Sequence, residues 1–173
     1  MSVGETGSAT TVDEPSSQEE LAGQYLSFEL AGEIYGVDIL KVREIKGWEE
    51  VRPLPDTPDY IKGVLDLRGV IVPIVDLRIR FQLESCEYTP TTVIIVLSVE
   101  LEGQQRVVGA VVDGVSDVLD VSSGDVRNAP DLGGKISQRY IKGMVTIAER
   151  MAILLDVNKL LDLQEMGLSE VID

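Results

Sequence analysis

The side chains in this sequence that could do chemistry are charged groups placed beside apolar runs. Arg68 stands alone between the two apolar runs of YIKGVLDLRGVIVPIVDL (60–77), with Gly69 directly after it. A single arginine in such a place is either a binding group or a solvated turn residue, because arginine side chains are mostly exposed. The stretch DVSSGD offers the carboxylates of Asp120 and Asp125 to a cation, but its spacing fails the pattern of an EF-hand loop.

Bond-making chemistry has little support in this sequence. Histidine, the commonest general base, is absent from all 173 residues. Its absence excludes Ser-His-Asp and Cys-His nucleophile systems and every zinc site that contains histidine. Carboxylate-only and Ser-Lys chemistry remain open, yet the residues present assemble into no such site. We therefore expect no enzymatic activity, no cofactor and no bound metal.

The charge balance excludes further classes of function. The chain has 15 Lys and Arg against 30 Asp and Glu, and its net charge of -15 repels nucleic-acid phosphates and anionic lipid surfaces. It contains no apolar run near the roughly 20 residues that cross a bilayer, and no signal-peptide pattern. The lone cysteine, Cys86, cannot form an internal disulfide. We expect a chain of the reducing cytosol that binds neither nucleic acid nor membrane directly.

A repeat indicates the elements that must position Arg68. The segment YIKGMVTIAERMAILLDV (140–157) aligns with residues 60–77 without a gap. Arg68 and Gly69 align with Ala148 and Glu149. Residues that both copies need should recur, so this comparison marks Arg68 as a candidate binding group that only one copy uses. The residues that do recur are Tyr60, Ile61, Lys62, Gly63 and Asp76, as Tyr140, Ile141, Lys142, Gly143 and Asp156.

The residues upstream of each copy repeat in the same order. Alternating apolar residues predict one hairpin over 25–39, with a turn at 31–33, and another over 92–119, with a turn at 102–104. Gly36, Val42, Glu44 and Ile45 correspond to Gly109, Val115, Asp117 and Val118 in this alignment. A unit of several short strands that occurs twice predicts a mainly β protein of two packed β-barrels related by a pseudo-twofold.

The same patterns divide the chain into segments. Residues 1–22 have the composition of a disordered acidic leader. We place the first barrel at about 23–85, the second at about 86–156, and a C-terminal helix at about 157–166. Asp76 and Asp156 precede short helical patterns and are expected to cap them.

Three stretches of the chain resemble the CheW-like coupling proteins of bacterial chemotaxis. They are GVDILKVREI (36–45), YIKGVLDLRGVIVPIVDLR (60–78) and VVGAVVDGVSDVL (107–119), within a resemblance that covers about 22–165. The resemblance implies a CheW-like domain at 23–165, built from two five-stranded SH3-like β-barrels. It also implies a noncatalytic, cytoplasmic adaptor recruited to membrane-associated receptor arrays. The implied partners are the cytoplasmic tip of methyl-accepting receptors, the regulatory domain of the histidine kinase CheA, and other copies of the adaptor in array rings.

The resemblance also implies positions for two binding sites. The receptor-facing groove between the barrels would contain Val42, Glu44, Gly63, Arg68, Val93, Gly109, Val115 and Val118. The kinase contacts would involve Gly47, Trp48, Arg127, Asp131 and Leu132. Glu44 and Arg68 could pair with each other or with polar receptor residues. Other interpretations remain open, namely core packing for the valines, a backbone role for Gly63, a half-buried lid for Trp48 and a solvated loop around Arg127.

A competing hypothesis is a β-barrel that binds a small ligand. It requires a roomy lumen lined by a few converging polar groups. The Val, Ile and Leu of these strands are instead expected to fill small barrels.

Overall fold

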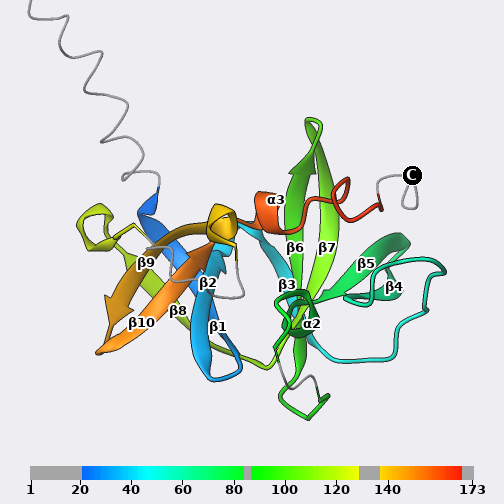
Figure 1. The fold of residues 1–173 in the computed structure, drawn as a ribbon, viewed down its shortest axis with the longest axis horizontal. Helices are drawn as coiled ribbons and strands as arrows, with labels where there is room; N and C mark the ends of the chain where they lie inside the picture. The colour runs from blue at the N-terminus through cyan, green and yellow to red at the C-terminus, as the bar shows by residue number, and fades with distance from the viewer. Residues whose placement is uncertain (1–20, 84–86, 129–136, 169–173) are drawn as a thin grey trace, which may run out of the picture.

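The computed structural model describes residues 21–83, 87–128 and 137–168 of a mainly β protein with few, short helices (Figure 1). The strands in these residues are β1 Gly23–Leu30, β2 Glu33–Asp38, β3 Val42–Gly47, β4 Ile61–Leu67, β5 Val70–Asp76, β6 Val93–Leu101, β7 Gln104–Val112, β8 Gly114–Val121, β9 Ile141–Ile147 and β10 Arg150–Leu155. The helices are α2 Leu77–Arg80 and α3 Val157–Leu160, with 3-10 turns η1 Ile39–Lys41, η2 Ser123–Asp125 and η3 Gln138–Tyr140. The predicted leader lies outside the described residues except for its last two positions.

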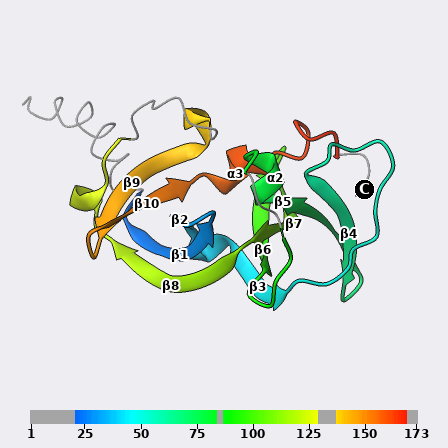
Figure 2. The ribbon, with the colours of Figure 1, turned by 60° about the horizontal axis from the view of Figure 1, so that its bottom comes forward.

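The strands form two five-stranded sheets, and each sheet takes strands from both repeats. One sheet has the order β8-β1-β2-β10-β9 and the other the order β3-β6-β7-β5-β4. We call the first the β1 barrel and the second the β6 barrel, and they lie side by side in Figure 2. The predicted boundaries of 23–85 and 86–156 are therefore wrong, because β1 and β2 pair with β8 and β10 and not with β3 to β5.

The exchange of strands follows from two crossings of the chain. After β2 the chain passes through η1 into the β6 barrel, and after β7 it returns at Asp113 to begin β8. Each repeat thus gives its first two strands to one barrel and its last three to the other. The two repeats have equivalent strand edges. Exchanging strands between them therefore keeps the same strand pairings, as domain swapping does between subunits.

The strand register confirms the residue equivalences of the repeat. Gly36 on β2 lies opposite Leu154 on β10, and Gly109 on β7 lies opposite Ile74 on β5, both in parallel pairs. The outer strands β8 and β3 also match, since each pairs with its neighbour through a ladder that contains a bulge. The two barrels are therefore copies of one architecture.

Isolated bridges and buried apolar side chains complete each barrel. Arg52, after β3, pairs with Val64 on β4, and the same bridge recurs in the β1 barrel after β8. The interior of the β6 barrel contains Leu65, Val72, Ile74, Ile94, Val96 and Val111, and that of the β1 barrel Tyr25, Val121, Val126, Val145, Ala152 and Leu154. Alternate residues of β6, such as Ile95 and Leu97, belong to a larger cluster shared by both barrels. These filled interiors argue against the small-ligand hypothesis.

The short helices follow the predicted caps but not the predicted length. The side chain of Asp76 accepts a hydrogen bond from the backbone N–H of Arg78, and Asp156 accepts one from Lys159. The predicted helix at 157–166 is wrong beyond Leu160, where α3 ends.

A second turn replaces the rest of that helix. The carboxylate of Asp162 accepts hydrogen bonds from the backbone N–H groups of Gln164 and Glu165. This turn lets Leu163 and Met166 reach the cluster shared by the barrels, where both are buried. Figure 1 shows the segment leaving α3 and running past β6 and β7.

Candidate functional site

Arg68 lies at the tip of a tight hairpin between β4 and β5. Leu67 pairs with Val70, so the turn consists of Arg68 and Gly69, whose φ angles are 54° and 89°. The backbone N–H of Gly69 donates to the carboxylate of Asp66 at 2.8 Å. Both residues thus have the positive φ that a two-residue hairpin turn requires. The turn places Arg68 at the exposed end of the hairpin.

Glu44 and Arg68 form an ion pair at the rim of a surface hollow. The Arg68 side chain is 78% exposed and that of Glu44 is 29% exposed. The hollow has a volume of about 440 Å³ and is lined by Arg43, Glu44, Leu67, Arg68, Val70, Val72, Val96 and Val107. We call it the valine hollow. It combines apolar side chains with the exposed cations of Arg43 and Arg68, which suits a helix that carries apolar side chains and a polar group.

The β1 barrel has a hollow at the equivalent place, with different chemistry. It has a volume of about 210 Å³ and is lined by Ser27, Ile34, Ser116, Asp117, Leu119, Ile147, Ala148, Arg150 and Ala152. Ser27 takes the place of Val96, and its hydroxyl donates to the carbonyl of Asp117 at 2.8 Å and accepts from the N–H of Asp117 at 2.9 Å. Ala148 takes the place of Arg68. The repeat thus conserves the position of the hollow but not its volume, and it changes the groups that a partner would meet.

A third hollow lies between the barrels. Its volume is about 420 Å³, and it contains Val93 from the β6 barrel and Val115 from the β1 barrel. We call it the seam hollow; Glu29, Thr91, Asp113, Gly114 and Ser116 complete its lining. Two other residues of the predicted groove lie apart from it. Val42 is half-buried against the shared core, and Val118 is 48% exposed on β8.

The two glycines of the predicted groove are approached by their own chain. A Cβ on Gly63 would lie 2.1 Å from the carbonyl oxygen of Arg52. A Cβ on Gly109 would lie 2.6 Å from Cδ1 of Ile74. Both residues are buried. They are positions where two segments of the barrel wall pack closely, which agrees with the backbone role left open for Gly63.

Trp48 lies half-buried over the interior of the β6 barrel and stacks on Tyr88. The ring centroids are 4.1 Å apart with an interplanar angle of 12°. Gly47 is exposed beside this pair at the end of β3, and Tyr88 is 38% exposed. This geometry fits the lid interpretation of Trp48 and still presents an aromatic surface. The contribution of Tyr88 was missed, because nothing in the sequence pairs it with Trp48.

The second predicted kinase contact is only partly within the described residues. Arg127 is exposed, and its backbone forms the bridge with Met144 that closes the β1 barrel. Trp48 and Arg127 therefore belong to different barrels. Asp131 and Leu132 lie outside the described residues.

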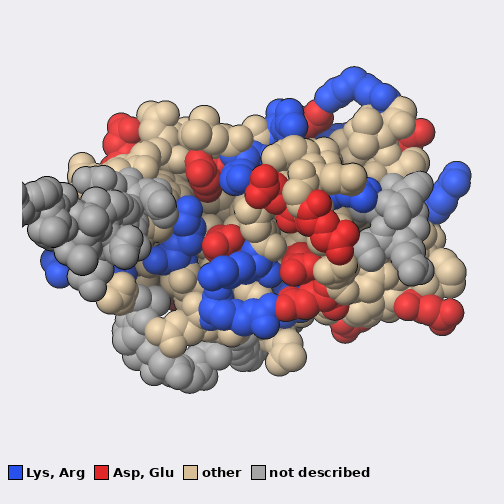
Figure 3. All heavy atoms as spheres, turned by 90° about the horizontal axis from the view of Figure 1, so that it is seen from above, with Lys and Arg blue, Asp and Glu red and all other residues tan. Residues whose placement is uncertain are grey.

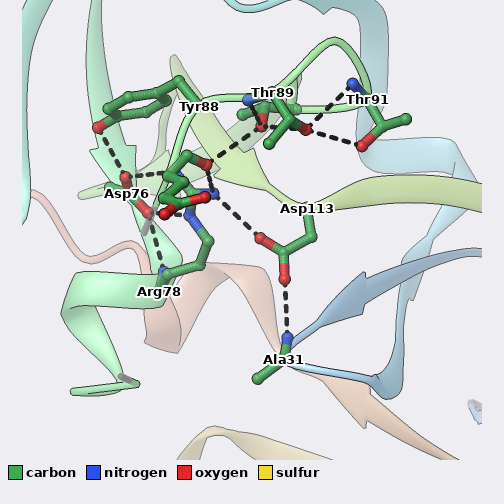
Figure 4. Close-up of polar contacts among 9 residues, drawn as sticks. Ala31, Asp76, Arg78, Tyr88, Thr89, Thr91 and Asp113 are labelled. Carbon is green, nitrogen blue, oxygen red and sulfur yellow. Dashed lines mark hydrogen bonds and ion pairs between the residues drawn. The ribbon is translucent and has the colours of Figure 1, made fainter. Parts of the chain in front are cut away.

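A buried charge network that the sequence did not reveal lies at the end of β5 (Figure 4). The guanidinium of Arg78 donates to both carboxylate oxygens of Asp76, at 2.9 and 3.0 Å, and to Asp113 at 3.0 Å. Arg78 is 1% exposed and Asp76 is fully buried. Burial lowers the pKa of Arg78, but its hydrogen bonds and the charges of Asp76 and Asp113 more than offset this and raise the pKa above its usual range.

Other sites have little support. Among the described residues, no three His, Cys, Asp or Glu side chains gather as metal ligands would. On the face shown in Figure 3, acidic and basic side chains lie next to one another. Within residues 21–83, 87–128 and 137–168, no helix has both the length and the apolar character to span a membrane.

The fold defines the class of this protein. It is a pair of SH3-like barrels with filled interiors, and its candidate sites are hollows on the surface and at the seam between the barrels. The model of the CheW-like domain matches residues 24–165, and the chain belongs to that family. The chemotaxis protein CheW of Klebsiella aerogenes is 48% identical over 150 residues, covering 87% of this chain and 88% of that protein. CheW of Rhizobium meliloti is 36% identical over 142 residues, covering 82% and 89%.

A solved structure shares the fold. It is the scaffolding protein TtCheW from Thermoanaerobacter tengcongensis, which aligns with a TM-score of 0.71 at 28% identity. The alignment covers 81% of this chain and 88% of that one. The predicted family and the predicted SH3-like double-barrel fold are confirmed.

Proposed function

We propose that this protein is a noncatalytic chemotaxis adaptor that couples methyl-accepting receptors to the histidine kinase CheA. Relatives that share most of its length are chemotaxis proteins, and a solved relative is a scaffolding protein. The observation that carries the proposal is the Glu44–Arg68 pair above the valine hollow, which only one of two equivalent barrels has. The protein acts in the cytoplasm, where receptor arrays recruit it.

The valine hollow and the seam hollow supply the receptor contacts. The receptor tip is a helical hairpin, and helices bind apolar grooves through side chains at i, i+3 and i+4. Val70 and Val107 in one hollow, and Val93 and Val115 in the other, offer the apolar surface. Exposed ion pairs are worth only about 0–1 kcal/mol, so Arg68 can exchange Glu44 for a receptor carboxylate at little cost.

The kinase contact uses a different part of the molecule. The Trp48–Tyr88 stack beside Gly47 offers an aromatic anchor, the type of residue that dominates interface energies. Arg127 on the β1 barrel provides a second contact, and Asp131 and Leu132, which lie outside the described residues, are proposed to take part in it. Further copies of the adaptor join through barrel-to-barrel contacts, so that many weak contacts act together in an array.

Separate binding assays test the proposal. Co-sedimentation with receptor-containing membranes measures one partner, and titration with the regulatory domain of CheA measures the other. Arg68→Ala should weaken receptor binding about tenfold or more and leave kinase binding unchanged. Arg150→Ala is the matched control, since Arg150 is an exposed arginine that lines the equivalent hollow of the β1 barrel. An equal loss of receptor binding and of kinase binding in Arg68→Ala contradicts the proposal. Loss of receptor binding in Arg150→Ala contradicts it as well.

A further inference from the structure

The Arg78 network connects the two barrels through Asp113. Asp113 occupies the point where the chain leaves β7 of the β6 barrel and enters β8 of the β1 barrel. One carboxylate oxygen accepts from Arg78 of α2 at 3.0 Å, and the other accepts from the backbone N–H of Ala31 at 2.8 Å. Ala31 lies in the β1–β2 turn, so this relay runs from the β6 barrel to the β1 barrel (Figure 4).

Further contacts hold each end of the relay. The backbone N–H of Asp113 donates to the carbonyl of Glu29 at 3.0 Å, which gives this residue a second bond to the β1–β2 hairpin. At the other end, Arg78 also donates to the carbonyl of Glu87 at 2.7 Å, and the hydroxyl of Tyr88 donates to Asp76 at 2.9 Å. These bonds hold the buried guanidinium of Arg78 in one geometry, because rotating it would leave a charge unpaired.

The second repeat makes the equivalent connection without charges. Asn158 on α3 takes the place of Arg78, and its side-chain oxygen accepts directly from the backbone N–H of Glu100 at 2.9 Å. Glu100 takes the place of Ala31. Both short helices therefore connect to the hairpin of the other barrel, but only the first uses an arginine and an aspartate. Only this charged connection borders the seam hollow, where Asp113 precedes Gly114 and Val115 in the lining.

We propose that Arg78 and Asp113 are positioning residues that set the relative orientation of the two barrels and so keep Val93 and Val115 at the spacing that a receptor helix requires. The part about the receptor rests on the proposed function. The orientation of the barrels is independent of it. Asp113→Asn removes the charge that pairs with Arg78 and leaves the hydrophobic core unchanged. Arg78→Lys is the second variant, since a single ammonium cannot bond both Asp76 and Asp113 as the guanidinium fork does.

The experiment measures distance and binding on the same variants. Spin labels at Ile45→Cys on β3 and Thr146→Cys on β9, both exposed, report the distance between barrels after Cys86→Ser removes the native thiol. The wild-type background should show one narrow distance distribution, and Asp113→Asn and Arg78→Lys should broaden or shift it. Binding of the receptor tip should fall about fivefold or more in both variants, as loss of a coupling energy predicts. Glu49→Gln makes the same carboxylate-to-amide change as Asp113→Asn at an exposed residue of the β6 barrel. It is the control and should alter neither the distance distribution nor receptor binding.

An unchanged distance distribution in folded Asp113→Asn and Arg78→Lys overturns the inference. So does a changed distribution with wild-type receptor affinity. Failure of the wild-type protein to bind the receptor tip instead overturns the proposed function, and the distance measurement then still decides whether the pair orients the barrels.

Discussion

Glu44 and Arg68, which are 24 residues apart in the chain, meet as an ion pair above the valine hollow, whereas their equivalents Asp117 and Ala148 cannot form one. A difference between two copies of the same architecture marks a group that the fold does not need twice, and so a candidate for contact with a partner. The fold needs the hairpin turn, which both copies retain. We expect that the charge at its tip, which the second copy lacks, is not needed for folding.

The double variant Glu44→Arg with Arg68→Glu tests this expectation. The pair is exposed, so the free energy of unfolding should stay within about 1 kcal/mol of wild type in chemical denaturation. Receptor binding should still fall about tenfold or more, because the guanidinium now projects from β3 and not from the turn. Recovery of wild-type affinity in the swapped protein would mean that attraction within the pair, and not contact with the partner, is what binding requires.

Gly109→Ala should destabilise the protein without touching a partner surface. The new Cβ would lie 2.6 Å from Ile74 and 2.8 Å from Ile94, inside the filled β6 barrel. Overpacking of this kind costs about 1–3 kcal/mol, which thermal or chemical unfolding will measure. Gly47→Ala is the control, because a Cβ there meets nothing within 4 Å. Equal stability of the two variants would show that β5 and β7 can separate to admit the methyl group.

Alkaline pH should unfold the protein through two buried tyrosines. Burial, and secondly the charge of Asp38, raises the pKa of Tyr25 to about 12. Burial, and secondly the charge of Glu33, raises the pKa of Tyr35 to about 12. The unfolded chain releases these protons near pH 10 and the folded chain does not. Stability is therefore complete below pH 10 and is lost as the pH rises toward 12.

The expected slope is about 1.4 kcal/mol per pH unit for each tyrosine between these limits. Chemical denaturation at a series of alkaline pH values will measure it. Tyr25→Phe and Tyr35→Phe should each reduce the slope. A slope that neither variant changes would assign the alkaline transition to other groups.

The fluorescence of Trp48 should report the kinase contact. Trp48 is the only tryptophan in the sequence, so its emission can be read without interference. Tyr88→Ala removes the stacked ring and should shift the emission to longer wavelength. It should cost about 0.5–1.5 kcal/mol of stability for the ring pair, and about 1.5–3 kcal/mol more for the lost hydrogen bond to Asp76. Adding the regulatory domain of CheA to the wild-type protein should change the emission, and adding the receptor tip should not. An emission that responds only to the receptor tip would contradict the assignment of Trp48 to the kinase contact.

Several features of the fold and site were predictable because they depend on neighbouring residues. The cap at Asp76, the turn at Gly69 and the hairpins follow from local geometry, and the gapless repeat drew attention to Arg68 because it aligns with Ala148. The helix after Asp156 was predicted too long, because the apolar pattern through Met166 also fits a turn that carries Leu163 into the shared core.

Other features depend on partners distant in the chain. The roles of Gly63 and Gly109 became visible only when Arg52 and Ile74 were placed against them. The Arg78 network needs Asp113, which the sequence places in the middle of an apparently continuous strand from 106 to 119. The predicted groove likewise divides into two hollows, since Arg68 lines one and Val93 lines the other.

The sequence by itself determined that this protein is a duplicated set of short strands, which residues of the two copies are equivalent, and where the copies differ. Only the tertiary structure decided which barrel each strand joins. The physical reason is that the copies carry nearly the same apolar pattern, so a strand can bury its face equally well in either sheet. The chain passes from one barrel to the other after β2 and after β7, and these crossings determine the barrel that each strand joins. The contact between Arg78 and Asp113 lies at the second crossing.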